Sequence, residues 1–291
     1  MSRRSAGARL ADRLHGRRRV QVGLLLSGPL AWLGVAYLGS LVVLFVAAFW
    51  QLDDFSGKVV HSYSLDNFRT LWDTPVYRTI VLRTVGIAAL VTITDILLAL
   101  PLAFYMAKIA SRRVRGILVV AVLMPLWASY LVKVYAWRTM LSNDGIINWA
   151  LAPFGLSGPG YGFVATWIVF SYLWLPYMIL PVYAGFERIS NSLVDASGDL
   201  GGRPATTFMR VVAPLVAPAV VAGSIFTFSL TLGDYITPQL VSSSQFIGNV
   251  VYANVGVANN LPLAAAFATV PVVVMVAYLL IARRLGAFES L

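Results

Sequence analysis

Residues 187–214 read ERISNSLVDASGDLGGRPATTFMRVVAP and lie between two long apolar segments. The pair Gly201-Gly202 predicts a break in this stretch, because glycine readily takes the left-handed backbone geometry that follows a helix end. Pro204 suits the first turn of a second helix, and Pro214 begins the next apolar segment. We therefore expect a polar loop that holds two short helices.

The first of these helices has candidate capping residues and an apolar side. Asn191 or Ser192 can cap its start, and Asp195 then falls in its first turn, where a negative charge is favourable. Apolar side chains recur through the same loop, at Leu193, Val194, Leu200 and Phe208. An exposed apolar cluster commonly marks a surface that another protein covers, so the loop is a candidate docking site.

The composition of the whole chain excludes an ordinary water-soluble domain. Its 291 residues have a mean hydropathy of +0.78, and 59% of them are hydrophobic. Charged residues make up only 12%, against about 25% in soluble proteins. The absence of cysteine excludes disulfides and thiolate metal ligands. The net charge of +10 does not indicate nucleic-acid binding, because that requires basic residues clustered on a solvated surface.

Six segments are apolar enough to cross a bilayer core of about 30 Å as helices, which takes about 20 residues. They are residues 22–50, 79–107, 117–137, 163–185, 215–236 and 263–282. Helices are expected because an unpaired backbone is costly in hydrocarbon, and a barrel would need short alternating segments. The first segment, at 29 residues, is longer than the apolar part of a signal peptide. The chain is therefore predicted to be an all-α integral membrane protein with six transmembrane helices.

The basic residues predict an orientation for these helices. Sixteen of the 22 lysines and arginines lie on one side, in residues 1–21, 108–115 and 188–210 and at Arg283 and Arg284. By the positive-inside rule, this side and both termini are cytoplasmic. The arginines of the N-terminal tail also suit contact with anionic membrane lipid.

The same pattern predicts the domain organisation. A basic cytoplasmic tail covers residues 1–21, a six-helix membrane domain covers residues 22–282, and a second cytoplasmic tail covers residues 283–291. On the outer side, residues 51–78 place aromatic side chains among polar ones. We expect a short ordered external element there.

The spacing within the 187–214 loop resembles the EAA motif of the permease subunits of ATP-binding-cassette (ABC) importers. That motif reads E-A-A, three residues, G, nine residues, then I-x-L-P. This chain has Asp195-Ala196-Ser197, three residues, Gly201, nine residues, then VVAP at residues 211–214. Every spacing matches, and the substitutions are of similar character. The chain is identified as a member of this family.

The resemblance implies the type I ABC importer permease fold and a mechanism. In this family the loop is a coupling helix that docks in a groove of a separate ATPase subunit. The residues implied in that contact are Asp195, Ala196, Ser197, Asp199, Leu200, Gly201 and Pro214. The resemblance also implies two ATPase copies, a second permease in a heterodimer, and an extracytoplasmic substrate-binding protein. It implies a multi-pass protein of the cell membrane.

ATP hydrolysis is not expected in this chain. A phosphate-binding P-loop needs glycines followed by Lys-Ser or Lys-Thr, and Lys58, Lys108 and Lys133 all lack that context. We therefore expect a transport subunit with no catalytic residues, metal site or cofactor of its own. ATP and Mg²⁺ would be bound by the partner ATPase.

Ionisable residues at membrane depth are costly and are candidates for function. Four of them lie in the expected spans, namely Arg83, Asp95, Lys133 and Asp234. Arg83 and Lys133 lie near outer ends, where long side chains can reach the membrane interface. Asp95 lies near the middle of the second span, where it can either pair with a helix of the partner subunit or line the substrate pathway.

The surroundings of Asp234 resemble the spermidine and putrescine branch of these permeases. That branch shows G-D-F-x-T-P-x-L-L-G-G and then I-G-N, and here residues 233–243 read GDYITPQLVSS and residues 247–249 read IGN. A carboxylate beside aromatic rings suits an organic polycation, through charge pairing and cation–π contact with Tyr235. We therefore predict polyamine import, with Asp234, Tyr235 and Asp95 along the pathway.

Three alternatives are open at this point. Asp234 can instead cap or brace the end of its own helix. Importers of phosphonate, thiamine, ferric iron or sugars share the fold and much of this segment. A gradient-driven secondary transporter could use Asp95 and Asp234, but it would leave the 187–214 loop without a role, and the chain lacks the inverted repeat typical of that class.

Overall fold

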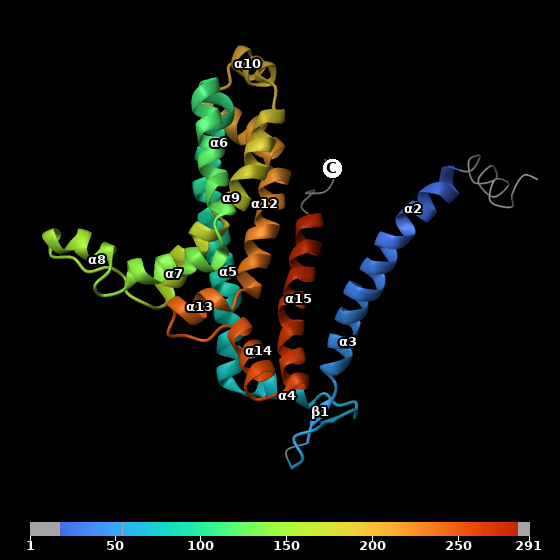
Figure 1. Ribbon diagram of the computed structural model, residues 1–291. Coiled ribbons are helices and arrows are strands. Elements are labelled where there is room, and N and C mark those ends of the chain that lie inside the picture. The colour runs from blue at the N-terminus through green and yellow to red at the C-terminus, as the bar shows by residue number, and fades with distance from the viewer. Residues whose placement is uncertain (1–17, 54, 285–291) are drawn as a thin grey trace, which may run out of the picture.

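The computed structural model describes residues 18–53 and 55–284 and is mostly helical, which confirms the all-α prediction (Figure 1). The first half contains α2 (Arg18–Trp32), η1 (Leu33–Leu38), α3 (Gly39–Ala47), β1 (Gln51–Leu52), β2 (Val59–Val60), α4 (Asp66–Asp73), α5 (Pro75–Phe104), η2 (Tyr105–Ile109), α6 (Arg112–Trp127), α7 (Tyr130–Leu141), α8 (Ile146–Leu151) and η3 (Ala152–Phe154). The second half contains α9 (Phe163–Arg188), α10 (Asn191–Asp199), α11 (Pro204–Thr207), η4 (Phe208–Val212), α12 (Ala213–Gly233), α13 (Ile236–Val241), α14 (Ile247–Gly256) and α15 (Leu261–Arg284). Of the four η elements, η1, η2 and η4 are π-helical and η3 is a 3-10 turn.

Five continuous helical rods in the described residues are long and apolar enough to cross a membrane. They are Leu25–Ala47, Pro75–Ile109, Phe163–Arg188, Pro204–Gly233 and Leu261–Arg284. Their positions match five of the six predicted segments. The helix beginning with α2 starts at Arg18, so the predicted boundary after residue 21 falls inside a helix. The rest of the predicted tails, residues 1–17 and 285–291, lies outside the described residues.

The predicted third span over residues 117–137 is not one straight helix. The chain breaks after Trp127, and α7 leaves α6 at an angle of 94°. Ala128 and Ser129 are extended, with ψ of 141° and 136°, and Pro125 lacks the N–H that would continue the helical hydrogen bonding. The apolar residues continue across the break, so hydropathy alone did not indicate it. At 16 residues, α6 is about 24 Å long, shorter than the hydrocarbon core.

The predicted fifth span, residues 215–236, begins earlier than predicted, at Pro204, and ends earlier, at Gly233. As predicted, Pro204 lies in the first turn of a helix, but this helix continues through η4 into α12 instead of stopping before Pro214. The π-helical turn changes the hydrogen-bond spacing just before the proline, which has no N–H to donate. At the other end the helix stops at Gly233, because Asp234 is extended.

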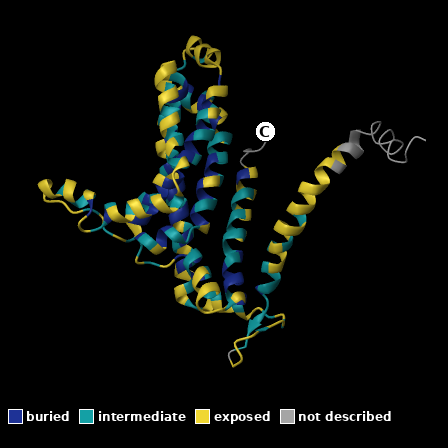
Figure 2. Ribbon diagram, in the orientation of Figure 1, coloured by how far each residue is buried: buried dark blue, intermediate teal, exposed yellow. Residues whose placement is uncertain are grey.

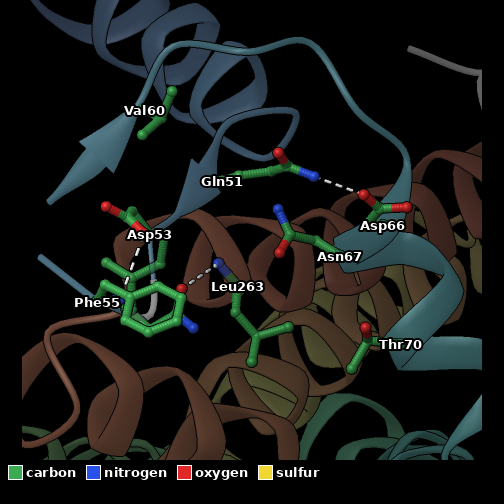
Figure 3. A pocket seen from close by; sticks show the side chains of 10 residues that line it. Gln51, Asp53, Phe55, Val60, Asp66, Asn67, Thr70 and Leu263 are labelled. Carbon is green, nitrogen blue, oxygen red and sulfur yellow. Dashed lines mark hydrogen bonds between the residues drawn. The ribbon is translucent and has the colours of Figure 1, made fainter. Parts of the chain in front are cut away.

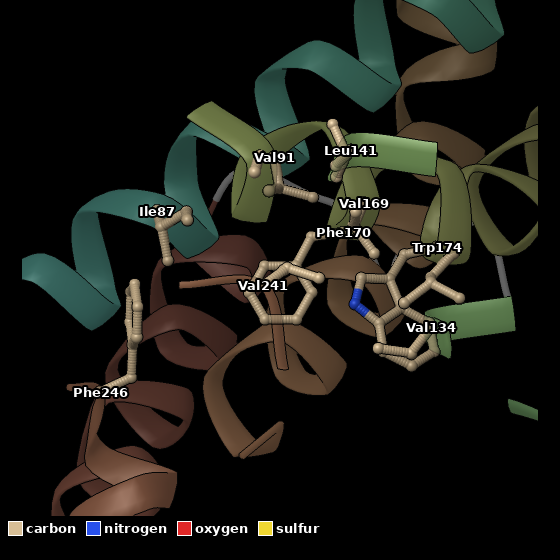
Figure 4. Packing of buried hydrophobic residues seen from close by; sticks show 11 residues of the cluster. Ile87, Val91, Val134, Leu141, Val169, Phe170, Trp174, Val241 and Phe246 are labelled. Carbon is tan, nitrogen blue, oxygen red and sulfur yellow. The ribbon is translucent and has the colours of Figure 1, made fainter. Parts of the chain in front are cut away.

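Three helices, α5, α9 and α12, form the core of the molecule, and Figure 2 shows most of the buried residues along them. They enclose two apolar clusters. The outer cluster joins Ile87 and Val91 of α5 to Phe170 of α9, together with residues of α7 and α13 (Figure 4). The inner cluster, nearer α10, contains Met178 and Phe186.

Two glycines bring α9 and α12 into close contact. A Cβ atom on Gly185 would lie 2.5 Å from the Cβ of Ala219, and one on Gly223 would lie 2.8 Å from the sulfur of Met178. Both distances are shorter than real Cβ contacts, and a Cβ on Gly223 would also lie 3.1 Å from the Cα of Met178, so neighbouring atoms would have to shift. Small residues at such contacts are typical of helix pairs in membranes, where packing replaces the hydrophobic effect.

The first helical rod, α2 to α3, stands apart from this core (Figure 1). Its apolar side chains are largely exposed, and its contact with the rest of the chain lies at the outer end, where Ala48 packs against Ala265 and Ala266 of α15. An apolar helix exposed on most of its surface fits contact with lipid or with another membrane subunit.

The short ordered element predicted for residues 51–78 is present as a hairpin and a helix. Strands β1 and β2 pair antiparallel, with Gln51 opposite Val60, and α4 follows. The Asn67 amide donates to the carbonyls of Ala48 and Trp50, and Gln51 donates to Asp66 at 2.5 Å. These bonds fix the element to the end of α3 and help shape a cavity of about 600 Å³ beside α15 (Figure 3).

The glycine contact predicts a selective effect of added side chains. Gly223→Val should lower the thermal unfolding midpoint in detergent, since overpacking a tight contact costs roughly 1–3 kcal/mol. Gly86→Val is the matched control, because Gly86 also lies in a membrane helix but has no atom within 4 Å of an added Cβ. Equal losses of stability in the two variants would contradict a close approach of α9 and α12.

Candidate functional site

The predicted docking loop forms a small projection at the end of the bundle away from the hairpin (Figure 1). Its first helix, α10, follows Ser190, whose side chain makes no capping hydrogen bond. The prediction that Asn191 or Ser192 caps this helix is wrong, because the capping position before the helix is Ser190. Ser190 is extended and Asn191 is already helical, so Asp195 falls in the second turn and not in the first.

The predicted glycine break is confirmed. Gly201 has a φ of +81°, and its N–H bonds to the Gly198 carbonyl at 2.8 Å. The N–H of Gly202 bonds to the Ser197 carbonyl at 2.9 Å, which completes the hydrogen-bond pattern of a Schellman helix end. A Cβ on Gly202 would lie 2.6 Å from that carbonyl oxygen. The first glycine is thus required by backbone geometry and the second by space.

The surface of α10 is mostly exposed. Leu200, directly after the helix, is 90% exposed, and Leu193 and Val194 are also exposed. Phe208 does not join this surface, contrary to the prediction, because its ring packs 6.3 Å from Phe104 at the inner end of α5.

The structure brings six of the seven predicted coupling residues together. Asp195, Ala196, Asp199, Leu200 and Gly201 are exposed on α10 and the turn after it. Ser197 is half-buried, where its hydroxyl contacts that of Thr207 in α11 at 2.8 Å. The seventh, Pro214, lies inside the long rod, well past the turn. These residues thus form one surface, without Pro214.

A cavity of about 370 Å³ lies beside the base of α10, between α9 and α12. Leu193 of α10 and Arg188 at the end of α9 line it, together with small residues and prolines of the two long helices. One wall of this inner cavity therefore belongs to the docking loop.

Asp95 lies inside the three-helix core with no exposed surface. Neither of its carboxylate oxygens has a hydrogen-bond partner among the described residues. One turn away, the Thr92 hydroxyl bonds to the Ala88 carbonyl and contacts Thr227 of α12 at 3.4 Å. Asp95 thus faces the interior of this chain, not a surface that a partner helix could reach in this conformation. Its place on the substrate pathway stays a prediction.

Asp234 lies at the break between α12 and α13 and is fully hydrogen-bonded. Its Oδ1 accepts the N–H groups of Ile236 and Thr237 at 2.9 and 3.1 Å. Its Oδ2 accepts the Thr237 hydroxyl at 3.0 Å and the hydroxyl of Tyr130. The carboxylate therefore caps the start of α13 and ties it to α7. The alternative expected a cap or brace at the end of its own helix, but Asp234 lies just after α12 and caps the helix that follows.

Asp234 also lines an open cavity of about 420 Å³. The walls include Tyr130 of α7, Trp174 of α9, and Ser229 and Leu230 of α12. The rings of Tyr130 and Trp174 stack at 6.1 Å with an interplanar angle of 13°. No described lysine or arginine pairs with Asp234. The site thus combines a carboxylate with two aromatic rings and no basic partner.

Tyr235 lies beside Asp234 and lines the same cavity. Its ring stacks on Tyr252 at 4.9 Å, and its carbonyl accepts a hydrogen bond from Asn249 at 2.9 Å. A Cβ on Gly248 would lie 2.9 Å from the Cβ of Tyr235. The IGN segment at residues 247–249 therefore packs directly against the GDY segment at residues 233–235, although residues 236–246 separate the two in the sequence.

The two basic residues predicted at membrane depth, Arg83 and Lys133, have different surroundings from the two carboxylates. Arg83 donates to the Gln245 carbonyl at 3.1 Å, so it joins α5 to the loop before α14. Lys133 lies half-buried in α7, beyond the bend. Neither residue lines the Asp234 cavity.

The sequence prediction missed Tyr130 and Trp174. Tyr130 reaches Asp234 only because the chain turns at residues 128–129, so a straight third span could not place it there. A signal was present in Pro125 and Ser129, since proline disturbs a helix and serine favours its start.

The Tyr130 contact predicts a stability effect. Tyr130→Phe removes one hydrogen bond to a partly buried carboxylate, which should cost roughly 1–3 kcal/mol of unfolding free energy. Tyr172→Phe is the control, since Tyr172 makes no hydrogen bond through its hydroxyl and contacts Trp137 through its ring. Thermal unfolding in detergent would measure both, and a loss in Tyr172→Phe as large as in Tyr130→Phe would argue against the contact.

Known proteins resemble this chain over nearly its whole length. Residues 89–287 match the family of binding-protein-dependent transport system inner membrane components. The inner membrane ABC transporter permease protein YdcU of Escherichia coli K12 is 46% identical over 92% of this chain and 90% of its own length. The spermidine/putrescine transport system permease protein PotB of Haemophilus influenzae is 28% identical over 77% of this chain and 80% of its own.

Two solved structures share the fold. One is a bacterial alginate ABC transporter in complex with an alginate pentasaccharide-bound periplasmic protein, with a TM-score of 0.74, 16% identity and coverage of 91% of this chain and 93% of that one. The other, a bacterial ABC transporter involved in alginate import, has a TM-score of 0.73, 17% identity and coverage of 95% and 99%. Together with the family match, they confirm the predicted family, the permease subunits of ABC importers, and the permease fold. This chain belongs to the binding-protein-dependent transport system inner membrane component family and is a multi-pass permease subunit of an ABC importer.

Proposed function

We propose that this permease forms half of a membrane pathway for polyamines such as spermidine and putrescine. The observation that carries the proposal is the Asp234 cavity, in which a carboxylate without a basic partner lies beside Tyr130 and Trp174. A carboxylate and aromatic faces together bind organic ammonium groups by charge and by cation–π attraction. The similarity to PotB and the resemblance of residues 233–249 to the spermidine and putrescine branch support the same substrate class.

The proposed topology has six spans with both termini in the cytoplasm. In it, α6 and α7 together form a bent third span, as their combined length and hydropathy allow. The positive-inside bias places α10 on the cytoplasmic side and the β1–β2 hairpin outside. The names of YdcU and of the family support a location in the inner membrane.

In this proposal α10 is the coupling helix and docks on a separate ATPase subunit. Two ATPase copies would bind ATP and Mg²⁺, a second permease would complete the pathway, and an extracytoplasmic binding protein would deliver the substrate. The exposed Leu193, Val194 and Leu200 supply the apolar surface that such docking requires.

Disrupting this surface should release the ATPase. Leu200→Asp places a charge at a side chain that is 90% exposed, so it should leave the fold intact and abolish co-purification of the ATPase. Leu156→Asp is the control, since Leu156 is also exposed (61%) but follows η3, at the opposite side of the membrane in the proposed topology. If the ATPase still co-purified with Leu200→Asp, the docking assignment would be contradicted.

Removing the charge at position 234 tests the substrate proposal. Asp234→Asn can still accept hydrogen bonds at α13 but loses the negative charge. In vesicles that contain the complete transporter, uptake of spermidine at limiting concentration should fall by about tenfold or more, the equivalent of 1.4 kcal/mol. Unchanged uptake of spermidine and putrescine would leave Asp234 with the capping role alone.

A further inference from the structure

One side chain joins the inner end of α5 to the start of α10. Lys108 lies in η2, the last turn of the α5 rod, and is half-buried. Its ammonium group donates a hydrogen bond to the Ile189 carbonyl and a second one to the Asn191 Oδ1 atom at 3.3 Å. Ile189 follows α9 directly, and Asn191 is the first residue of α10. A single cation therefore connects α5 to the beginning of the docking helix.

Helix α10 is attached to the other two core helices in different ways. The chain itself continues from α9 through Ile189 and Ser190 into α10. At its other end α10 leads through the glycine turn to the α11–α12 rod, and Ser197 and Thr207 reinforce that connection. Helix α5 has no such chain connection to α10. Within residues 18–53 and 55–284, no hydrogen bond or ion pair other than those of Lys108 joins the two.

The neighbouring basic residue has another role. Arg115 of α6 pairs with Glu187 of α9 at 3.5 Å and donates to the Ala107 carbonyl at 3.2 Å. The Tyr183 hydroxyl also donates to Glu187. These contacts join α6 to α5 and α9 and do not reach α10. Both side chains of the ion pair are more than one-third exposed, so solvent weakens their attraction.

The position of Lys108 is physically favourable. The carbonyl groups at the end of α9 have no partner within their own helix, and the C-terminal ends of α5 and α9 both carry partial negative charge. An ammonium group placed between them satisfies the Ile189 carbonyl and complements both helix ends. The side-chain oxygen of Asn191 then fixes the direction of the lysine.

We propose that Lys108 is the positioning residue through which movement of α10 is transmitted to α5. The proposal rests on the proposed docking of α10 on an ATPase. When the ATPases close, the chain moves α9 and α12 with α10. Helix α5 follows through its packing on those helices and, at the end beside α10, through Lys108. Lys108 thereby keeps the end of α5, the helix that carries Asp95, aligned with α10 while the packed core moves.

The test uses the complete transporter reconstituted in vesicles. Lys108→Met should leave assembly and basal ATP hydrolysis near the parent values, while spermidine uptake per ATP falls by about fivefold or more, the usual lower range of coupling effects. Lys108→Arg keeps the donors and should restore most of the ratio. Asn191→Ala removes one of the two acceptors and should give an intermediate ratio. Arg113→Met is the control, since Arg113 is exposed and has no bond to a described residue.

A second measurement reports on the geometry directly. The chain has no cysteine, so spin labels at Ile109→Cys and Ser192→Cys mark the exposed ends of the α5 rod and α10 without further changes. After ATP is added, the distribution of distances between the two labels should stay narrow in the parent chain. In Lys108→Met the same distribution should broaden.

Three outcomes would overturn the proposal: an unchanged uptake ratio in Lys108→Met, equal label distances in the two chains, or a loss that Lys108→Arg does not restore. Failure of the underlying docking proposal looks different, because no ATPase would then co-purify with the parent chain.

Discussion

The contact between α9 and α12 at Gly185 and Gly223 is the constraint on which the other features depend. An added Cβ at either glycine would lie closer to an atom of the other helix than real Cβ atoms come. The docking loop joins these same two helices, from the end of α9 to the start of the α11–α12 rod. The inner cavity beside α10 and the outer cavity beside Asp234 are both lined by this pair. The spacing of α9 and α12 thus sets the geometry of both sites.

A second constraint acts at the two helix breaks. A break exposes backbone N–H and carbonyl groups, which are costly to leave unpaired at membrane depth. The breaks before α7 and before α13 meet each other: Tyr130 opens α7, Asp234 precedes α13, and the two side chains are hydrogen-bonded. Asp234 also satisfies two N–H groups of α13. The capping role and the cavity-lining role of Asp234 therefore come from one arrangement and do not exclude each other.

The sequence predicted those features that depend on local composition. Apolar runs located five long helices, and Gly201 and Pro204 located the turn and the following helix, because each of these signals acts within a few residues. The bend at residues 128–129 was not predicted, since the hydropathy of the segment is the same whether the chain is straight or bent. The position of Phe208 and the contact between Tyr130 and Asp234 depend on tertiary packing, which no local pattern contains.

The packing also limits how the outer cavity can move. Trp174 belongs to α9, Leu230 belongs to α12, and Tyr130 of α7 is bonded to Asp234 at the end of α12. The tight glycine contacts pack α9 directly against α12, so these walls belong to one packed unit. In the proposed function, a rigid unit of this kind would keep the cavity lining intact while access to it changes. In the proposed heterodimer the opposite surface would belong to the second permease, and α10 would then act by rotating an intact half-site and not by deforming it.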